Sequence, residues 1–148
     1  MTDDRSDRRA RLGAATVATA AAFGAPAEAA GASRLTVRIL DLHGGVPADG
    51  VAVDLARREG EAFRPVKTVT TRASGRPDGP LLEGGAFTAG RYRLAFDLIT
   101  SFTARDPNLP KGFFRKVALE FGVADPGQPH HLPPQCTPWT QACSVLPG

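Results

Sequence analysis

The heptapeptide LTVRILD at residues 35–41 is the stretch that decides the fold. Its apolar residues at 35, 37 and 39 alternate with Thr36 and Arg38. Successive side chains of a β-strand point to opposite faces, so this alternation predicts a strand with one apolar face. Glycine and proline follow at residues 43–47, where we expect a turn.

The same alternation recurs along the chain between turn signals. Strands are predicted over residues 51–55, roughly 63–70, 90–96 and 115–124, and a short helix over 98–104. Val66 is expected among the inward-facing residues of the second of these strands. Short strands separated by Gly/Pro turns are the pattern of an all-β sandwich. The length of 148 residues suits a single domain.

Two segments are rich in residues that break strands. The loop at 73–80 should end the strand before it, and Arg76 is the one residue in that loop with functional chemistry. Six prolines lie between residues 126 and 147. Because proline cannot donate to a strand ladder, any strand around residues 130–137 is expected to be an edge strand or interrupted.

The net charge of +3 comes from dispersed arginines. The chain has no run of basic residues with interleaved aromatics, which argues against a nucleic-acid partner. The arginines at 57–58 and at 91 and 93 are expected on solvated strand faces.

Residues 1–29 have the order of features of an export signal peptide. Arginines precede an apolar, alanine-rich stretch at 12–23, and small residues surround a cleavage site that we place after Ala29. The arginines at 8–9 resemble a twin-arginine signal, although nearby acidic residues and Arg11 depart from that pattern. The apolar stretch is short for a membrane anchor. Residues 30–148 are therefore expected in the periplasm or outside the cell, without a membrane partner.

Cys136 and Cys143 are the two cysteines of the chain. Two cysteines alone do not make a structural zinc site. In an oxidising compartment, a disulfide that closes this short loop is the favoured interpretation. The alternative is two thiols in an irregular tail.

Several short motifs together resemble the transthyretin-like 5-hydroxyisourate hydrolase family. They are ILD at 39–41, GVPA at 45–48, GR at 75–76, GRYRLAF at 90–96, GFF at 112–114, and DP at 125–126 leading into HLP at 131–133. Each is weak alone, but their order and spacing cover nearly all of the mature chain. The resemblance implies an all-β, two-sheet transthyretin-like β sandwich with one short helix, assembled as a homotetramer.

The resemblance also implies hydrolytic opening of 5-hydroxyisourate in urate breakdown, without metal or organic cofactor. Family members place two imidazoles and a guanidinium in a cleft at a subunit interface. His131 matches one family histidine and is the candidate general base, since an unperturbed imidazole pKa of ~6.5 permits proton transfer near neutral pH. Arg76 matches the family arginine, whose planar fork of donors suits an anionic purine oxygen. Ser144 aligns with a family serine as a further substrate-binding candidate.

Two positions depart from the family pattern. Arg38 stands where the family has its other histidine, and residues 146–148 stand where the family has Tyr-Arg-Gly-Ser. A guanidinium stays charged and cannot act as a general base, so we expect impaired catalysis but stronger anion capture. Arg38 is therefore kept as a candidate catalytic and substrate-binding residue.

Three interpretations of function follow. The leading one is an exported 5-hydroxyisourate hydrolase with reduced activity. The alternative is a non-catalytic transthyretin-like protein that binds small anions through its arginines. The third is an exported β sandwich that serves as an interaction module. From the residues alone, His131 would be a surface imidazole and Arg76 a loop arginine in water.

Overall fold

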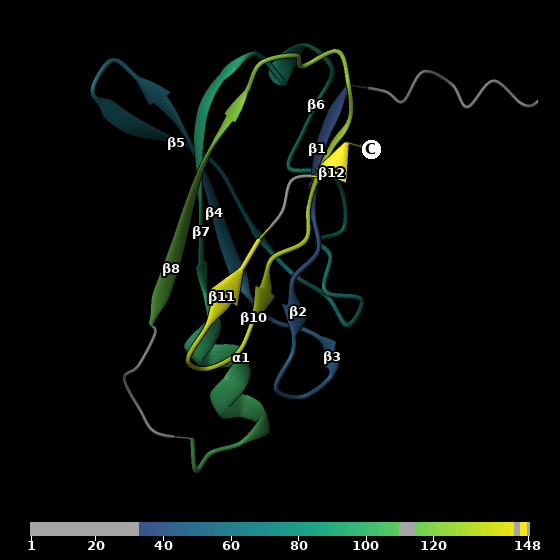
Figure 1. Ribbon diagram of the computed structural model, residues 1–148, viewed down its shortest axis with the longest axis vertical. Coiled ribbons are helices and arrows are strands. Elements are labelled where there is room, and N and C mark those ends of the chain that lie inside the picture. Colours follow the sequence, from purple (N-terminus) through teal and green to yellow (C-terminus); the bar gives the residue numbers. More distant parts are fainter. Residues whose placement is uncertain (1–32, 110–114, 144–145, 148) are drawn as a thin grey trace, which may run out of the picture.

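The computed structural model describes residues 33–109, 115–143 and 146–147. The predicted export signal at residues 1–29 and the candidate Ser144 lie outside these ranges. The described chain forms two layers of β-strands with one α-helix near an end (Figure 1). The predicted β sandwich with one short helix is therefore confirmed.

One layer is a continuous antiparallel sheet of long strands. It consists of β4 (Ala52–Glu59), β5 (Ala62–Thr70), β7 (Gly90–Asp97) and β8 (Lys116–Val123), in the order β5-β4-β7-β8. These elements match the four strands predicted after the first one. Alternate residues of β7 face the core, and Tyr92, Leu94 and Phe96 are fully buried, as the period of two requires.

The other layer is built from short strands in two groups. The first is β6 (Leu82–Glu83), β1 (Arg34–Val37), β9 (His130–Leu132) and β12 (Leu146–Pro147); the second is β3 (Val46–Pro47), β2 (Leu40–Asp41), β10 (Gln135–Cys136) and β11 (Gln141–Ala142). The chain runs from β1 into β2 and from β9 into β10. Between the groups, the N–H of Arg38 donates to the carbonyl of Leu132 at 3.0 Å. Backbone hydrogen bonding therefore continues between the two groups of strands, although the strands themselves are interrupted there.

The prolines at 133 and 134 separate β9 from β10, because proline supplies no N–H to a ladder. The interruption predicted for this segment is confirmed. The segment does not lie at an edge, however. Strand β9 lies between β1 and β12, and β10 lies between β2 and β11.

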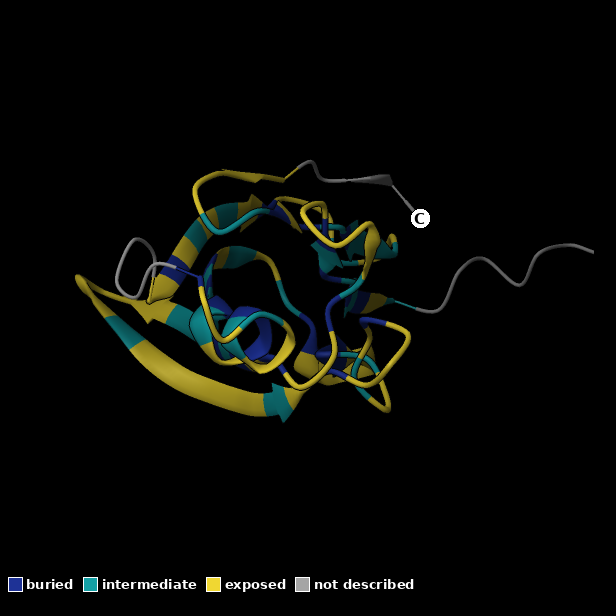
Figure 2. Cartoon of the chain, turned by 90° about the horizontal axis from the view of Figure 1, so that it is seen from below, coloured by how far each residue is buried: buried dark blue, intermediate teal, exposed yellow. Residues whose placement is uncertain are grey.

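The hydrophobic core lies between the two layers. The alternating residues Leu35, Val37 and Ile39 are at most 1% exposed and belong to one cluster with the inward residues of the long sheet. Figure 2 shows the buried residues gathered inside the molecule and the exposed ones along its outer strands and loops. The pattern at residues 35–41 therefore fixes which face of this layer is internal.

The helix α1 (Leu98–Arg105) follows β7 directly, as predicted. The carboxylate of Asp97 accepts a hydrogen bond from the N–H of Ile99 at 3.2 Å and so caps the helix N-terminus. Leu98 and Phe102 are buried against the core. No helix within the described ranges is both long enough and apolar enough to cross a membrane.

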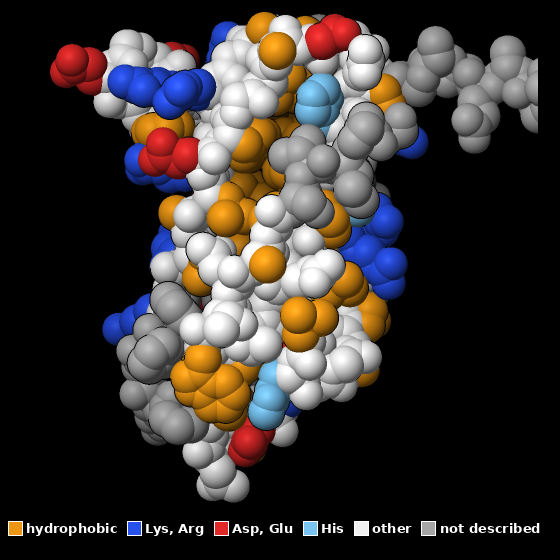
Figure 3. Space-filling model, viewed as in Figure 1, with side chains coloured by type: hydrophobic (Ala, Val, Ile, Leu, Met, Phe, Trp, Pro, Cys, Tyr) orange, Lys and Arg blue, Asp and Glu red, His pale blue; other side chains and the backbone are white. Residues whose placement is uncertain are grey.

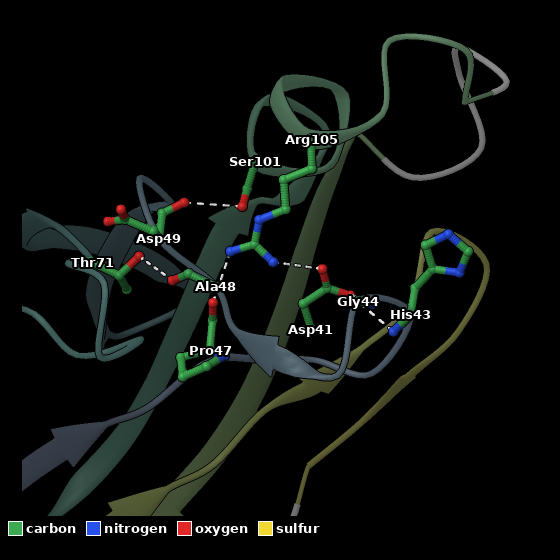
Figure 4. Close-up of polar contacts among 9 residues, drawn as sticks. All are labelled: Asp41, His43, Gly44, Pro47, Ala48, Asp49, Thr71, Ser101 and Arg105. Carbon is green, nitrogen blue, oxygen red and sulfur yellow. Dashed lines mark hydrogen bonds and ion pairs between the residues drawn. The ribbon is translucent and has the colours of Figure 1, made fainter.

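The end of α1 is tied to the short-stranded layer (Figure 4). Arg105 donates through Nη1 to Oδ2 of Asp41 at 2.8 Å and through Nη2 to the carbonyl of Pro47 at 2.8 Å. Oδ1 of Asp41 accepts the N–H groups of His43 and Gly44 at 2.8 and 2.9 Å. Asp41 is only 3% exposed, so these donors satisfy a buried carboxylate.

The expectation that Val66 faces inward is wrong, because its side chain is 45% exposed. Leu55 pairs with Lys67, whereas the next residue, Ala56, pairs with Pro65. The extra residue in β5 forms a β-bulge, which leaves Val66 without a partner in β4 and reverses the alternation. Val69 packs against the core in its place.

The disulfide predicted between Cys136 and Cys143 is also wrong, because the structure holds Cys136 as a thiol. Cys136 is buried and Cys143 is exposed. Burial raises the pKa of the Cys136 thiol to about 12. A thiol in that state supplies little of the thiolate that disulfide formation requires.

Candidate functional site

The outer face of β1 and β9 carries the side chains predicted for the site. The two strands pair in parallel, with Leu35 opposite His130 and Thr36 opposite His131. Because Leu35 is fully buried, its neighbour Thr36 points away from the core, and His131 lies beside it. Arg38 follows two residues after Thr36 and therefore lies on the same face.

The other two histidines do not belong to this face. The ring of His130 lies 5.5 Å from the ring of the buried Phe87, measured between centroids, and its Nδ1 lies 2.9 Å from the carbonyl oxygen of Gln128. His43 is exposed in the turn after β2, where its ring contacts Trp139 edge-on at 5.6 Å. His130 and His131 are neighbours in β9, and their side chains point to opposite faces of the strand.

The loop at 72–76 brings Arg76 to the site. Gly75 has a φ of +73°, and a Cβ at this position would lie 2.4 Å from the carbonyl oxygen of Ile39. Only glycine permits this approach. The carbonyl of Gly75 accepts the N–H of Ile39 at 2.9 Å, and Nε of Arg38 donates to the carbonyl of Ser74 at 3.3 Å. These bonds hold the loop, with Arg76, against the segment that carries Arg38.

Both guanidinium groups act on the half-buried imidazole of His131. Burial is the main cause that lowers the pKa of His131 from its ordinary value of 6.5, and the charges of Arg76 and Arg38 lower it further. The ring is therefore neutral at neutral pH and can accept a proton. Figure 3 shows Lys and Arg side chains gathered at the side of the molecule where β1 and β2 lie.

Thr36 is a site residue that the sequence reasoning missed. Its Oγ1 lies 2.9 Å from Nδ1 of His131 and donates to the carbonyl of His130 at 3.4 Å. The available signal was its position two residues before Arg38, on the same face of a predicted strand. That Thr36 lies opposite His131 could not be known without the register of β1 and β9.

The structure thus brings together three of the four predicted site residues: His131, Arg76 and Arg38. Ser144 lies outside the described residues. The tail enters this region through β12, in which Leu146 pairs with His131. In the sequence, residues 146 and 147 are leucine and proline, which differ in chemical type from the Tyr-Arg-Gly-Ser of the family pattern.

Among the described residues, no group of three or more His, Cys, Asp or Glu side chains is placed to hold a metal ion. What the site offers is a neutral imidazole beside two permanent positive charges. A neutral imidazole can take a proton, and guanidinium groups can bind an anion or stabilise a developing oxyanion. The arrangement therefore suits proton transfer next to a negatively charged group.

The family model of the HIUase/Transthyretin family matches residues 35–143. The chain belongs to this family. Its relatives include 5-hydroxyisourate hydrolase 2 of Rhizobium meliloti, which is 41% identical over 107 residues, covering 72% of this chain and 89% of the relative. The 5-hydroxyisourate hydrolase of Ralstonia nicotianae is 40% identical over 108 residues, covering 72% and 92%.

Solved structures also superpose on this chain. An (S)-allantoin synthase matches with a TM-score of 0.71 and 30% identity, over 76% of this chain but only 43% of the synthase chain. Sea bream transthyretin in complex with thyroxine matches with a TM-score of 0.69 and 23% identity, over 78% of this chain and 96% of that chain. At that identity, the match to sea bream transthyretin is evidence for a shared fold alone. The family resemblance predicted from the motifs is confirmed.

Proposed function

We propose that this protein is a hydrolase that opens the ring of 5-hydroxyisourate in urate breakdown. One observation carries the proposal. In a chain that is 41% identical to a 5-hydroxyisourate hydrolase, the neutral imidazole of His131 lies within the electrostatic reach of Arg76 and Arg38. The reaction adds one water molecule across a cyclic amide and needs no electron transfer.

His131 is the proposed general base. Its lowered pKa keeps the ring unprotonated at neutral pH, so it can take a proton from a water molecule. The resulting hydroxide adds to the carbonyl carbon of the cyclic amide. The C–N bond then breaks, and the proton passes from the imidazolium to the departing nitrogen. The ring of His131 ends the cycle neutral.

Arg76 and Arg38 are the proposed substrate-binding groups. Each guanidinium presents planar N–H donors to a carbonyl or anionic oxygen of the purine-derived ring. The same donors stabilise the oxyanion that forms when hydroxide adds. Arg38 cannot also accept a proton, as the histidine of the family pattern can. We therefore expect the rate of this protein to lie below that of relatives with both histidines.

The test is an assay with substrate generated in place. Urate is oxidised by urate oxidase, and the ultraviolet decay of 5-hydroxyisourate is followed with and without the protein. The expected result is decay faster than in buffer, with His131→Ala slower by ~10²–10⁴, the usual contribution of a positioned acid–base group. His43→Ala is the matched control, because His43 is exposed in a turn away from the site. A wild-type rate equal to the spontaneous rate would contradict the proposal.

A second candidate function is non-catalytic binding of small anions. The observation that favours it is the presence of two guanidinium groups beside a neutral ring. Calorimetry with urate, which the enzyme cannot hydrolyse, measures this binding directly. Binding that Arg76→Gln weakens, in a protein without hydrolytic activity, would support this candidate. Loss of both properties would favour the interaction module.

We further propose that the mature protein, residues 30–148, is an exported homotetramer. The order of features in residues 1–29 supports export, and the N-terminus of the protein in culture tests it. Mass spectrometry is expected to find cleavage after Ala29, and an intact Met1 on cell-associated protein would contradict export.

Family membership supports the tetramer, which light scattering at micromolar concentration tests. A monomeric mass would contradict it.

A further inference from the structure

The contacts of Thr36 bear on which nitrogen of His131 carries the proton. The hydroxyl of threonine has one proton to donate and lone pairs to accept with. Its Oγ1 has two partners, the carbonyl oxygen of His130 at 3.4 Å and Nδ1 of His131 at 2.9 Å. A carbonyl oxygen can only accept. Both contacts are hydrogen bonds only if the hydroxyl donates to His130 and accepts from a protonated Nδ1 of His131.

We propose that Thr36 is a positioning residue that holds His131 in its Nδ1–H tautomer, so that Nε2 is the nitrogen that accepts a proton. The inference rests on the proposed hydrolytic role of His131. A general base needs its lone pair aimed at the water, and the other ring nitrogen fixes that aim through its own hydrogen bond. Thr36 can do this because the register of β1 and β9 places it directly opposite His131.

The surroundings of the dyad are consistent with this assignment. Both strands are tied by backbone bonding, since the N–H of Arg38 donates to the carbonyl of Leu132 at 3.0 Å, so Thr36 and His131 cannot slide past each other. Among the described residues, the causes that lower the pKa of His131 are burial, Arg76 and Arg38, and none of these is a carboxylate. In many proteins, a carboxylate or a backbone carbonyl accepts the hydrogen bond from the second ring nitrogen of a functional histidine. In this chain, the hydroxyl of Thr36 has that role.

The tautomer is measured on the resting protein by NMR of ¹⁵N-labelled histidine at pH 7.5. In the wild type, Nδ1 of His131 is expected to show the shift of a protonated nitrogen and Nε2 that of an unprotonated one. Thr36→Val keeps the β-branched shape and removes the hydroxyl, so we expect the Nε2–H form to appear. Thr36→Ser keeps the hydroxyl and should restore the wild-type spectrum. Thr68→Val, on the exposed strand β5, is the matched control.

Activity gives the second readout. Thr36→Val is expected to lower kcat by about threefold to tenfold, which corresponds to the loss of one neutral hydrogen bond, and Thr36→Ser to recover it. A wild-type ring protonated on Nε2, or a Val variant that keeps the Nδ1–H form, would overturn the inference. The wild-type spectrum decides even if the Val variant fails to fold. Failure of the proposed function is a separate result, because the absence of hydrolysis leaves the tautomer measurement intact.

Discussion

The carbonyl oxygen of Gly75 accepts a hydrogen bond from the N–H of Ile39 at 2.9 Å, which ties the loop of Arg76 to the residue that follows Arg38. The two arginines are 38 positions apart in the sequence, and the charges of both lower the pKa of His131. The geometry of the site therefore depends on the close approach between the backbone at Gly75 and the backbone at Ile39. That dependence makes the loop a sensitive place for substitution.

Gly75→Ala should reduce both stability and activity. The new Cβ would lie 2.4 Å from the carbonyl oxygen of Ile39, in a residue with a φ of +73°. The left-handed conformation alone costs ~1–2 kcal/mol for a residue with a side chain, and the clash adds to it. Urea unfolding and the hydrolysis assay measure the two effects. Gly79→Ala in the same loop has nothing within 4 Å of its Cβ and should change neither.

Arg105→Met should lower the free energy of unfolding. The change removes the guanidinium from a carboxylate that is 3% exposed and leaves Asp41 with only its backbone donors. The expected loss is about 1–3 kcal/mol, reduced from that of a fully buried pair because Arg105 is one-third exposed. Arg72→Met is the control, because Arg72 and Asp78 are 66% and 74% exposed. An equal effect of both variants would contradict the role of Asp41.

Arg38→His should raise the rate of hydrolysis and weaken the binding of urate. The change replaces a fixed charge by a group that can accept a proton, and one such group is worth ~10²–10⁴ in rate. We expect a gain of about tenfold or more, with Arg58→His, on the exposed end of β4, as the control. No gain from an inactive parent would favour the binding protein. A fast parent rate that the substitution leaves unchanged would place Arg38 outside the site.

The free energy of unfolding should decrease as the pH is lowered to and below the ordinary pKa of His131. The folded protein has a pKa lower than 6.5 at this residue, so the unfolded chain binds the proton more tightly. Acidification then favours unfolding, and the effect is absent well above pH 6.5, where neither state is protonated. Denaturant titrations of His131→Gln should show a smaller loss between pH 7.5 and 5.5 than the wild type. Equal losses would contradict the shift.

Much of the fold could be predicted because burial in a sandwich imposes a period of two on the sequence. Residues 35–41 and β7 follow that period strictly, and the apolar residues expected to face inward are buried. Val66 could not be placed in this way. Its direction depends on a one-residue shift in pairing between β4 and β5, which is a property of two strands together.

The site was only partly accessible to sequence reasoning. His131, Arg76 and Arg38 could be selected by their resemblance to a family pattern, because their chemistry and their order in the chain are both specific. Thr36 could not, since threonine is common in strands and its role depends on the residue opposite. The disulfide was predicted from the compartment and the loop length, and neither considers that one thiol is enclosed in the core.

The bulge in β5 also bears on how the protein behaves at high concentration. Strand β5 is one of the two outer strands of the long sheet, and an outer strand with regular unpaired N–H and C=O groups is a template on which another chain can add. Here Pro65 supplies no N–H, and the extra residue Val66 breaks the regular spacing of the remaining groups. This edge is therefore poorly suited to strand-by-strand aggregation, and fibril growth would have to begin at another part of the molecule.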